Sequence, residues 1–330
     1  MTDTASNLSS ATAPRLEYVP ADPAAALGPD VLAAVTFGGS PGTHADPRYL
    51  RVGLEPLQSV KVMELWRASG PVQSAVDGAI RYSADAHYLF GIVELDEREL
   101  GGIAGAAETA YTAIRRFAQG SAHPHLLRVW NHFDDINGGE GDQERYRQFC
   151  IGRAAGLSDW HRHPYPAATA IGRQGGDPTL QVYWLAAREP GVALENPRQV
   201  NPWSYPRSYG PVPPQFSRAM RVGENLVLIS GTASIVGYES HHALDLAAQL
   251  NESLANLESV LARAGATAPR VHGRIGSKGL LKVYLRDATA AAIVEAQLNK
   301  RRPSMPHLLL AGDICRRDLL VEVECVQGGS

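Results

Sequence analysis

Apolar and polar positions alternate near the C-terminal end of the chain and predict a strand over residues 319–326. Successive side chains of a strand point to opposite faces, so Glu322 and Glu324 share one face. The residues of the other, apolar face are Leu319, Val321, Val323 and Cys325. A half-solvated strand with its polar side chains in water is the common outcome of such a pattern. If a helix covers the apolar face, both carboxyl groups instead point at whatever lies across the sheet.

Along the rest of the chain, one order of elements is predicted twice. The first run reads strand, helix, strand, helix, strand, strand, over residues 88–95, 104–119, 126–132, 142–155, 167–172 and 180–187. The second run opens with a hairpin at 219–222 and 226–230 and continues in the same order over 242–264, 280–286, 288–298, 307–311 and 319–326. Two short strands, at 31–38 and 49–54, precede both runs. We therefore expect an α/β (α+β) fold of two similar halves, each a mixed sheet backed by helices.

A proline-rich connector, residues 188–217, separates the two runs and excludes a regular helix or a central strand there. The connector contains four aromatic residues, Trp203, Tyr205, Tyr209 and Phe216, which argue against a flexible linker. Long ordered loops are usually functional. We expect the connector to be ordered and to line a site. The predicted division is an N-terminal tail (1–30), an N-terminal subdomain (31–190), the connector (191–217) and a C-terminal domain (218–330).

Composition narrows the class of protein. The chain has 330 residues, 44% of them hydrophobic, and a formal net charge of −3, so no basic excess points to nucleic acid or to a membrane surface. It contains no apolar run long enough to span a membrane, and its first residues lack the features of a signal peptide. Three cysteines do not make a disulfide framework in a chain of this length. We expect a cytoplasmic protein with reduced thiols.

Arginines offer the clearest binding chemistry. Arg145 and Arg147 flank Tyr146 at the start of a predicted helix, and Arg301 and Arg302 precede the last two strands. Arginine binds a carboxylate through a planar fork, so two such sites suit a small ligand with two carboxylates. The alternative is that these arginines form exposed ion pairs, which contribute little.

Two further candidates are weaker. His161 and His163 stand two residues apart, but no cysteine or carboxylate at ligand spacing completes a metal site, so a surface loop is the expectation and no metal is predicted. Cys315 is followed by Arg316 and Arg317, whose charges could lower the pKa of its thiol. No histidine beside it in the sequence supports a cysteine–histidine nucleophile.

The C-terminal third, from 229–237 to 313–324, resembles the Rid (YjgF-like) superfamily, whose fold is also described as chorismate-mutase-like. The whole chain resembles one branch of it, the chorismatases. The matching stretches are YLFG (88–91), VWNHFDDIN (129–137), ERYRQFCIGR (144–153), YPRSYGPVPPQFSRA (205–219), SGTAS (230–234) and GDICRRDLLVEVE (312–324).

This resemblance implies an enzyme that cleaves the enolpyruvyl ether of chorismate and releases pyruvate without a metal or organic cofactor. The family's general acid maps to Glu322, on the last strand. The family's 3-hydroxybenzoate-forming type has a cysteine seven residues earlier, which here is Cys315. The variable position of the SGTAS motif is Ala233, as in the hydrolytic type. The pair of Ala233 with Cys315 most resembles the type that forms both 3- and 4-hydroxybenzoate.

The resemblance also implies substrate contacts by Tyr88, Arg147, Tyr205 and an arginine near the last strands, for which Arg302 is preferred over Arg301. Two alternatives stay open, a Rid-type enamine or imine deaminase and a non-catalytic ligand-binding protein. Rid domains generally form trimers, but a duplicated chain could satisfy such contacts internally. Both a homotrimer and a monomer therefore stay open.

Overall fold

We analysed a computed structural model of the chain. It describes residues 13–22, 27–42, 44–158, 164–268, 270–271, 273–276, 278–303 and 305–328. The candidates His161 and His163 lie outside these residues. No helix in the described ranges is both long enough and apolar enough to cross a lipid bilayer.

Two six-stranded sheets share one strand order. The first sheet is ordered β5-β6-β7-β10-β8-β9 and the second β11-β12-β13-β18-β16-β17. The strands of the first are Gln73–Asp77 (β5), Ile80–Ala84 (β6), Tyr88–Asp96 (β7), His125–Asp134 (β8), Ala167–Arg173 (β9) and Thr179–Ala187 (β10). Those of the second are Val192–Leu194 (β11), Ala219–Val222 (β12), Leu226–Ala233 (β13), Gly279–Leu285 (β16), His307–Ala311 (β17) and Val321–Gln327 (β18). Only β8–β9 and β16–β17 pair in parallel within these sheets, so both are mixed, as expected.

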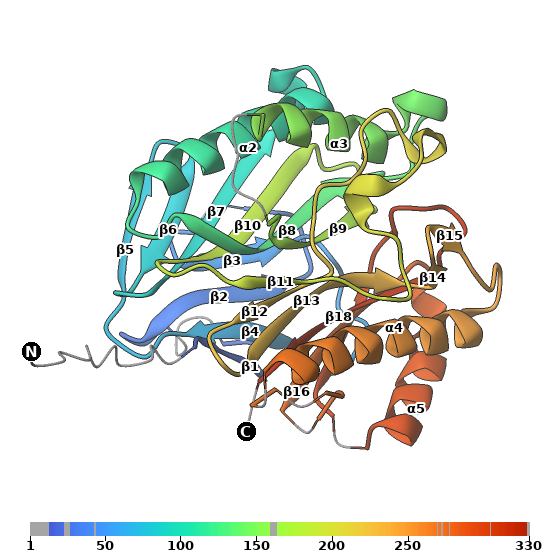
Figure 1. Cartoon of the computed structure of the whole chain (residues 1–330). Coiled ribbons are helices and arrows are strands. Elements are labelled where there is room, and N and C mark those ends of the chain that lie inside the picture. Colours follow the sequence, from blue (N-terminus) through green and yellow to red (C-terminus); the bar gives the residue numbers. More distant parts are fainter. Residues whose placement is uncertain are drawn as a thin grey trace, which may run out of the picture.

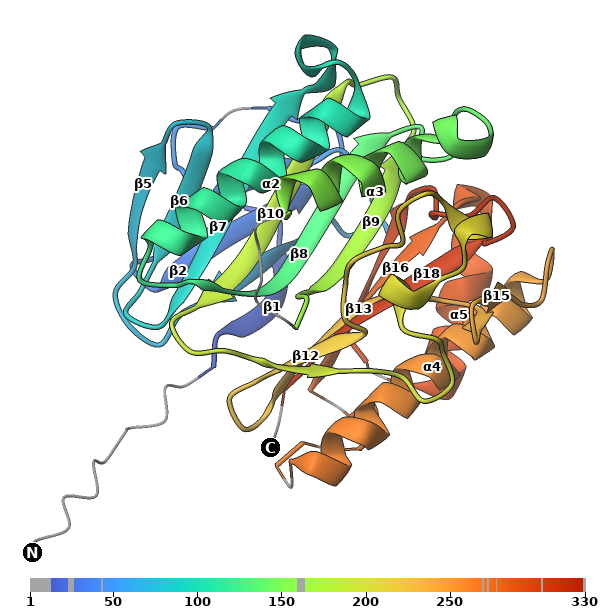
Figure 2. The same cartoon turned by 45° about the horizontal axis from the view of Figure 1, so that its top comes forward.

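Helices occupy equivalent places in the two halves. They are α2 (Ile103–Gly120) and α3 (Arg145–Gly156) in the first half, and α4 (Leu246–Thr267) and α5 (Ala291–Arg301) in the second. Each pair covers the outer face of its own sheet, at opposite sides of the molecule (Figures 1 and 2). The helix predicted from residue 142 begins later, because a 3-10 turn occupies Gly141–Gln143. The order of elements and the helical backing confirm the expected α/β fold of two similar halves.

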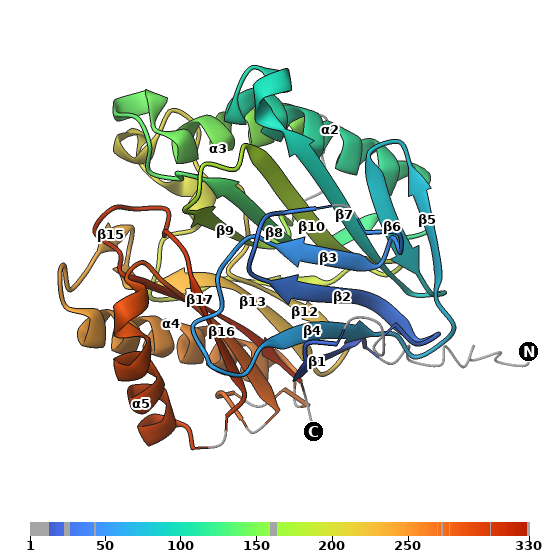
Figure 3. The same cartoon turned by 180° about the vertical axis from the view of Figure 1, so that it is seen from behind.

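A third sheet, of four strands, lies behind the two halves (Figure 3). Its order is β1-β4-β2-β3, with β1 at Arg15–Pro20, β2 at Val31–Phe37, β3 at Tyr49–Val52 and β4 at Val62–Arg67. The predictions of β2 and β3 are confirmed, whereas β1, β4, β5 and β6 were missed. Trp66 of β4 packs in one core with Trp130 and Tyr284 of the two larger sheets. The inner faces of all three sheets therefore enclose one interior.

The remaining elements are short. They are the strands β14 (Ile235–Val236) and β15 (Glu239–Ser240) and 3-10 turns at Glu97–Leu100, Pro202–Ser204, Arg207–Tyr209 and Ala288–Ala290. The connector contributes β11 and two of these turns. It is ordered, as predicted, and runs across the junction of the two halves (Figure 2).

Candidate active site

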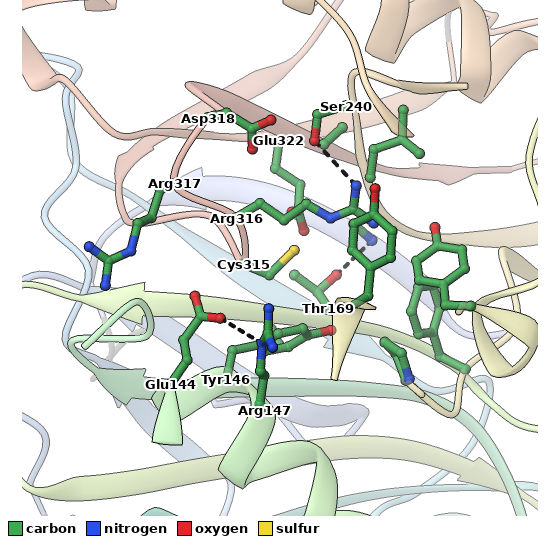
Figure 4. Close-up of a pocket in the computed structure, with 18 of the residues that line it drawn as sticks. Glu144, Tyr146, Arg147, Thr169, Ser240, Cys315, Arg316, Arg317, Asp318 and Glu322 are labelled. Carbon is green, nitrogen blue, oxygen red and sulfur yellow. Dashed lines mark hydrogen bonds and ion pairs between the residues drawn. The ribbon is translucent and has the colours of Figure 1, made fainter. Parts of the chain in front are cut away.

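A pocket of about 730 Å³ lies where the two halves meet. Its walls come from α3, β9, β13, the connector, the loop before β18, and β18 itself (Figure 4). The residues that carry polar or reactive groups into it include Glu144, Tyr146, Arg147, Arg153, Thr169, Tyr205, Tyr209, Arg218, Cys315, Arg316, Arg317 and Glu322. Tyr205, Ser208, Tyr209, Pro214 and Phe216 belong to the connector, so the expectation that it lines a site is confirmed.

Strand β18 is buried on both faces. Its apolar side chains Val321, Val323 and Cys325 pack in the core formed with α4. Glu322 and Glu324 face the interior and are only 5% and 4% exposed. The solvated-strand alternative is therefore wrong: α4 covers the apolar face, and the carboxyl groups point across the sheet.

Glu324 is fully partnered. Its Oε2 accepts from Arg128 Nη2 at 2.6 Å and from Thr169 Oγ1 at 2.7 Å, and its Oε1 accepts from Trp130 Nε1 at 3.0 Å. Lys282 Nζ lies 2.9 Å from Oε1. Burial alone would raise the pKa of this carboxyl, but Lys282 and Arg128 outweigh it and lower the pKa to about 2. Glu324 is ionised at neutral pH.

Glu322 has the opposite surroundings. Among the residues that the structure describes, none donates a hydrogen bond to its carboxyl group, which lines the pocket. Burial, with a smaller contribution from the charge of Glu324, raises its pKa to about 8, and Arg128 and Arg218 oppose this only partly. A carboxyl group that keeps its proton at neutral pH can act as a general acid.

A β-bulge makes room for this carboxyl. The pairing of β13 with β18 shifts register between Ile229 and Thr232, so Gly231 lies under Glu322, and a side chain at 231 would overlap the Glu322 carboxyl. Beyond the bulge, Ala233 pairs directly with Glu322.

Cys315 lines the same pocket, but its thiol is not activated. Burial and the neighbouring Glu322 raise its pKa to about 12. The sequence suggested a lowered pKa, and that is wrong because burial and the charge of Glu322 outweigh the charge of Arg316, which lowers it. Arg316 lies 4.1 Å over the Tyr209 ring and donates to the Tyr238 carbonyl, while Arg317 donates to backbone carbonyls of residues 137 and 139.

Two buried arginines hold unused donors. Arg153, 4% exposed, has no hydrogen-bond partner at Nε or Nη2 among the described residues and lies over the Tyr111 ring. Arg218, 5% exposed, donates from Nη2 to the Tyr205 hydroxyl at 2.8 Å but has a buried Nε without a partner. Arg218 also has Glu195 as a charged neighbour, whose pKa it lowers against the effect of burial. Buried guanidinium donors without partners are costly unless a ligand supplies an acceptor.

Five of the residues expected at the site line this one pocket: Arg147, Tyr205, Ala233, Cys315 and Glu322. Arg147 is already paired, because its Nε donates to Glu144 at 3.0 Å and its Nη1 lies 3.7 Å from Asp142.

The other three expected residues lie elsewhere. Tyr88 is buried in the core between the sheets, Arg301 is exposed at the end of α5, and Arg302 pairs with Glu258 of α4. None of these three lines the pocket, so the arginines near the last strands that can meet a ligand there are Arg316 and Arg317.

Sequence reasoning missed Arg153, Arg218, Thr169 and Gly231. Three of them stand inside stretches singled out by the resemblance, and that was the available signal: Arg153 in ERYRQFCIGR, Arg218 in YPRSYGPVPPQFSRA and Gly231 in SGTAS. For Thr169 the sequence offered none, because its partner Glu324 is 155 residues away.

Comparisons with known proteins agree with this geometry. A family model described as "Chorismatase FkbO/Hyg5-like, N-terminal" matches residues 64–186. A chorismatase from Streptomyces hygroscopicus is 36% identical over 273 residues, which cover 79% of this chain and 78% of that protein. A 3-hydroxybenzoate synthase from the same organism is 34% identical over 280 residues, or 80% of each protein. A chorismatase crystal structure superimposes with a TM-score of 0.85 and 31% identity, covering 97% of this chain and 99% of that one. The chain therefore belongs to the chorismatase family.

Proposed function

We propose that this protein is a chorismatase, which cleaves the enolpyruvyl ether of chorismate to pyruvate and a hydroxybenzoate. The observation that carries the proposal is Glu322, a buried carboxyl to which none of the described residues donates a hydrogen bond, in a pocket of about 730 Å³, with a pKa raised to about 8. An enol ether is cleaved by protonation of its terminal methylene carbon, and that step needs an acid that still holds its proton near neutral pH.

Glu322 supplies that proton, and the proton becomes part of the methyl group of pyruvate. The ether carbon becomes an oxocarbenium ion, and the carboxylate left on Glu322 stabilises it electrostatically in a site shielded from water. Capture by a ring hydroxyl of the substrate leads to pyruvate and hydroxybenzoate with no net water consumed. Capture by water would instead release a dihydroxycyclohexadiene carboxylate.

Arg153 and Arg218 are suited to the two carboxylates of chorismate. Both line the pocket, both are buried, and both hold donors without partners. Arg147 and Tyr205 complete this wall, with Tyr205 fixed by its hydrogen bond from Arg218. Bidentate arginine contacts would position the enolpyruvyl group over Glu322.

Cys315 and Ala233 are placed to influence the product. Both lie next to Glu322, Cys315 on the loop before β18 and Ala233 on the neighbouring strand. Because the thiol is protonated, Cys315 acts on the intermediate as a neutral donor or by its shape. We expect both 3- and 4-hydroxybenzoate among the products.

The pocket is lined by residues of a single chain, drawn from both six-stranded halves. A monomer and a homotrimer are both compatible with this arrangement. We also retain the division into two Rid-like units (31–190 and 218–330) and a connector (191–217) as a proposal, whereas the segment expected as a tail (1–30) contains β1, which pairs with β4.

Incubation with chorismate tests the proposal. We expect stoichiometric pyruvate, measured by coupling to lactate dehydrogenase, and hydroxybenzoates resolved by chromatography. A deaminase would release ammonia from imino acids and no pyruvate from chorismate. A binding protein would protect against thermal unfolding with chorismate yet release nothing. Either result would overturn the proposed function.

A further inference from the structure

A row of buried charges crosses the interior and reaches all three sheets. Lys282 Nζ of β16 lies 2.7 Å from Glu64 Oε1 of β4 and 2.9 Å from Glu324 Oε1 of β18. Glu324 in turn pairs with Arg128 of β8 at 2.6 Å. These four side chains are between 1% and 5% exposed. Buried charges are retained only when they are paired, so the row has a defined arrangement of charge.

The row ends beside the pocket. Thr169, which lines the pocket, donates to Glu324 Oε2 and accepts from the Gly231 amide at 2.9 Å. Register sets the two glutamates apart, because Glu324 pairs with Lys282 on β16 whereas Glu322 pairs with Tyr284. Among the residues that the structure describes, Glu324 thus has four donors, and Glu322, two positions earlier on the same strand, has none.

We propose that Glu324 is a positioning residue: it holds Lys282, Arg128 and Thr169 as an ionised carboxylate, and thereby leaves Glu322 as the carboxyl that carries the proton. Without Glu324, the Arg128 guanidinium would lose the carboxylate that it contacts. Glu322 is the other carboxyl group on the same strand face, and Arg128 already favours its ionised form, while Glu64 stays paired with Lys282. Glu322 would then ionise as the partner of Arg128 and lose its proton. The role in turnover rests on the proposed function, whereas the effect on protonation does not.

Several other titratable groups face Glu322, and the sign of each charge decides which protonation state of the Glu322 carboxyl it favours. The like charge of Glu324 favours the protonated form, and Arg128 and Arg218 favour the ionised form. Tyr146 of α3 and Cys315 of the preceding loop lie close enough to be affected by Glu322, but burial keeps both neutral, as their raised pKa values indicate. Burial is the largest cause of the raised pKa of Glu322, and Glu324 is the one carboxylate among these groups that adds to it.

The test is the titration of the Glu322 carboxyl, followed by carbon NMR in protein labelled at glutamate side chains and assigned by its loss in Glu322→Gln. In the wild type we expect a midpoint near pH 8. In Glu324→Gln we expect the midpoint to fall by at least about one pH unit, a tenfold change in proton affinity. Glu324→Asp keeps the charge and should retain most of the high midpoint. Glu94→Gln, which removes a partly buried ion pair with Arg81 on β6 and β7, is the matched control and should change nothing.

The alkaline limb of kcat/KM for chorismate should move to lower pH in Glu324→Gln by the same amount. An unchanged Glu322 midpoint in folded Glu324→Gln, or an equal shift in Glu94→Gln, would overturn the inference. If Glu324→Gln does not fold, a wild-type Glu322 midpoint at pH 4 to 5 would overturn it as well. A shifted midpoint without any chorismate turnover would support this inference and contradict the proposed function.

Discussion

Gly231 lies directly under the carboxyl of Glu322, so that a methyl group at position 231 would overlap Glu322 Oε1 and press against the Thr169 side chain. The contact is set by the bulge between β13 and β18 and fixes where the proton of Glu322 can be delivered. The acid thus depends on a residue that has no side chain.

Gly231→Ala should displace Glu322 and lower kcat by at least ~10²-fold, because a general acid contributes about that factor. The matched control is Gly120→Ala, at the end of α2, where an added methyl group meets no atom within 4 Å. Both variants are compared by kcat with chorismate and by circular dichroism. Equal activity of the two would show that the position of the Glu322 carboxyl is unimportant.

Substitutions of Arg153 and Arg147 show which of the two arginines binds a substrate carboxylate. Arg153→Met removes a buried guanidinium with two unpaired donors, so we expect KM for chorismate to rise by a factor equivalent to about 2–4 kcal/mol. Arg147→Ala should raise KM less, because Arg147 already pairs with Glu144 and Asp142. Steady-state kinetics on both variants decide the order. A larger effect at Arg147 would place the substrate carboxylate at the start of α3.

Cys315→Ala should change the product more than the rate. The Cys315 thiol lies beside Glu322 and is neutral, so it acts after protonation, when the intermediate partitions. We expect the share of 3-hydroxybenzoate to fall while chorismate consumption is reduced less. Chromatography of the products together with total pyruvate gives both quantities. A parallel fall in both would assign Cys315 to the first step or to folding.

Glu322 should reduce the stability of the fold as pH rises. Its pKa is about 8 in the folded chain and near its ordinary value of 4.5 in the unfolded chain. Below pH 4.5 both states hold the proton, so the carboxyl carries no penalty. Between pH 4.5 and 8 only the unfolded state releases it, so the free energy of unfolding falls, by a few kcal/mol in all.

Glu322→Gln removes this loss. The variant should gain stability over the wild type at pH 8.5 relative to pH 5, as measured by urea denaturation at the two pH values. If the difference in stability between Glu322→Gln and the wild type were the same at pH 5 and pH 8.5, Glu322 would ionise normally in the folded chain.

The sequence predicted those helices and strands whose apolar and polar residues follow a regular spacing within one segment. The apolar stripes gave all four helices and most of the strands, and alternation correctly paired Glu322 with Glu324 on one face. The strand β4 was missed because its sequence, VMELWR, does not alternate between apolar and polar residues, and β5 because all its residues are exposed. Neither pattern distinguishes a strand from its alternatives.

The electrostatics of the site could not be predicted in this way. Arg128 and Glu324 are 196 residues apart, and only the closure of the interior by all three sheets brings Lys282 between Glu64 and Glu324. Alternation made the two glutamates equivalent, whereas in the described part of the chain Glu324 has four hydrogen-bonding or ion-pair partners and Glu322 has none. Resemblance to a family selected Glu322, and the surroundings supply the physical reason.

The central claim is that Glu322 delivers the proton that cleaves the enol ether, and its most direct test is pyruvate release from chorismate by Glu322→Gln. This variant keeps the shape of the side chain and removes the transferable proton. We expect kcat to fall by at least ~10²-fold, while chorismate binding, followed by calorimetry, is retained. Near-wild-type pyruvate release by Glu322→Gln would contradict the account and place the acid elsewhere.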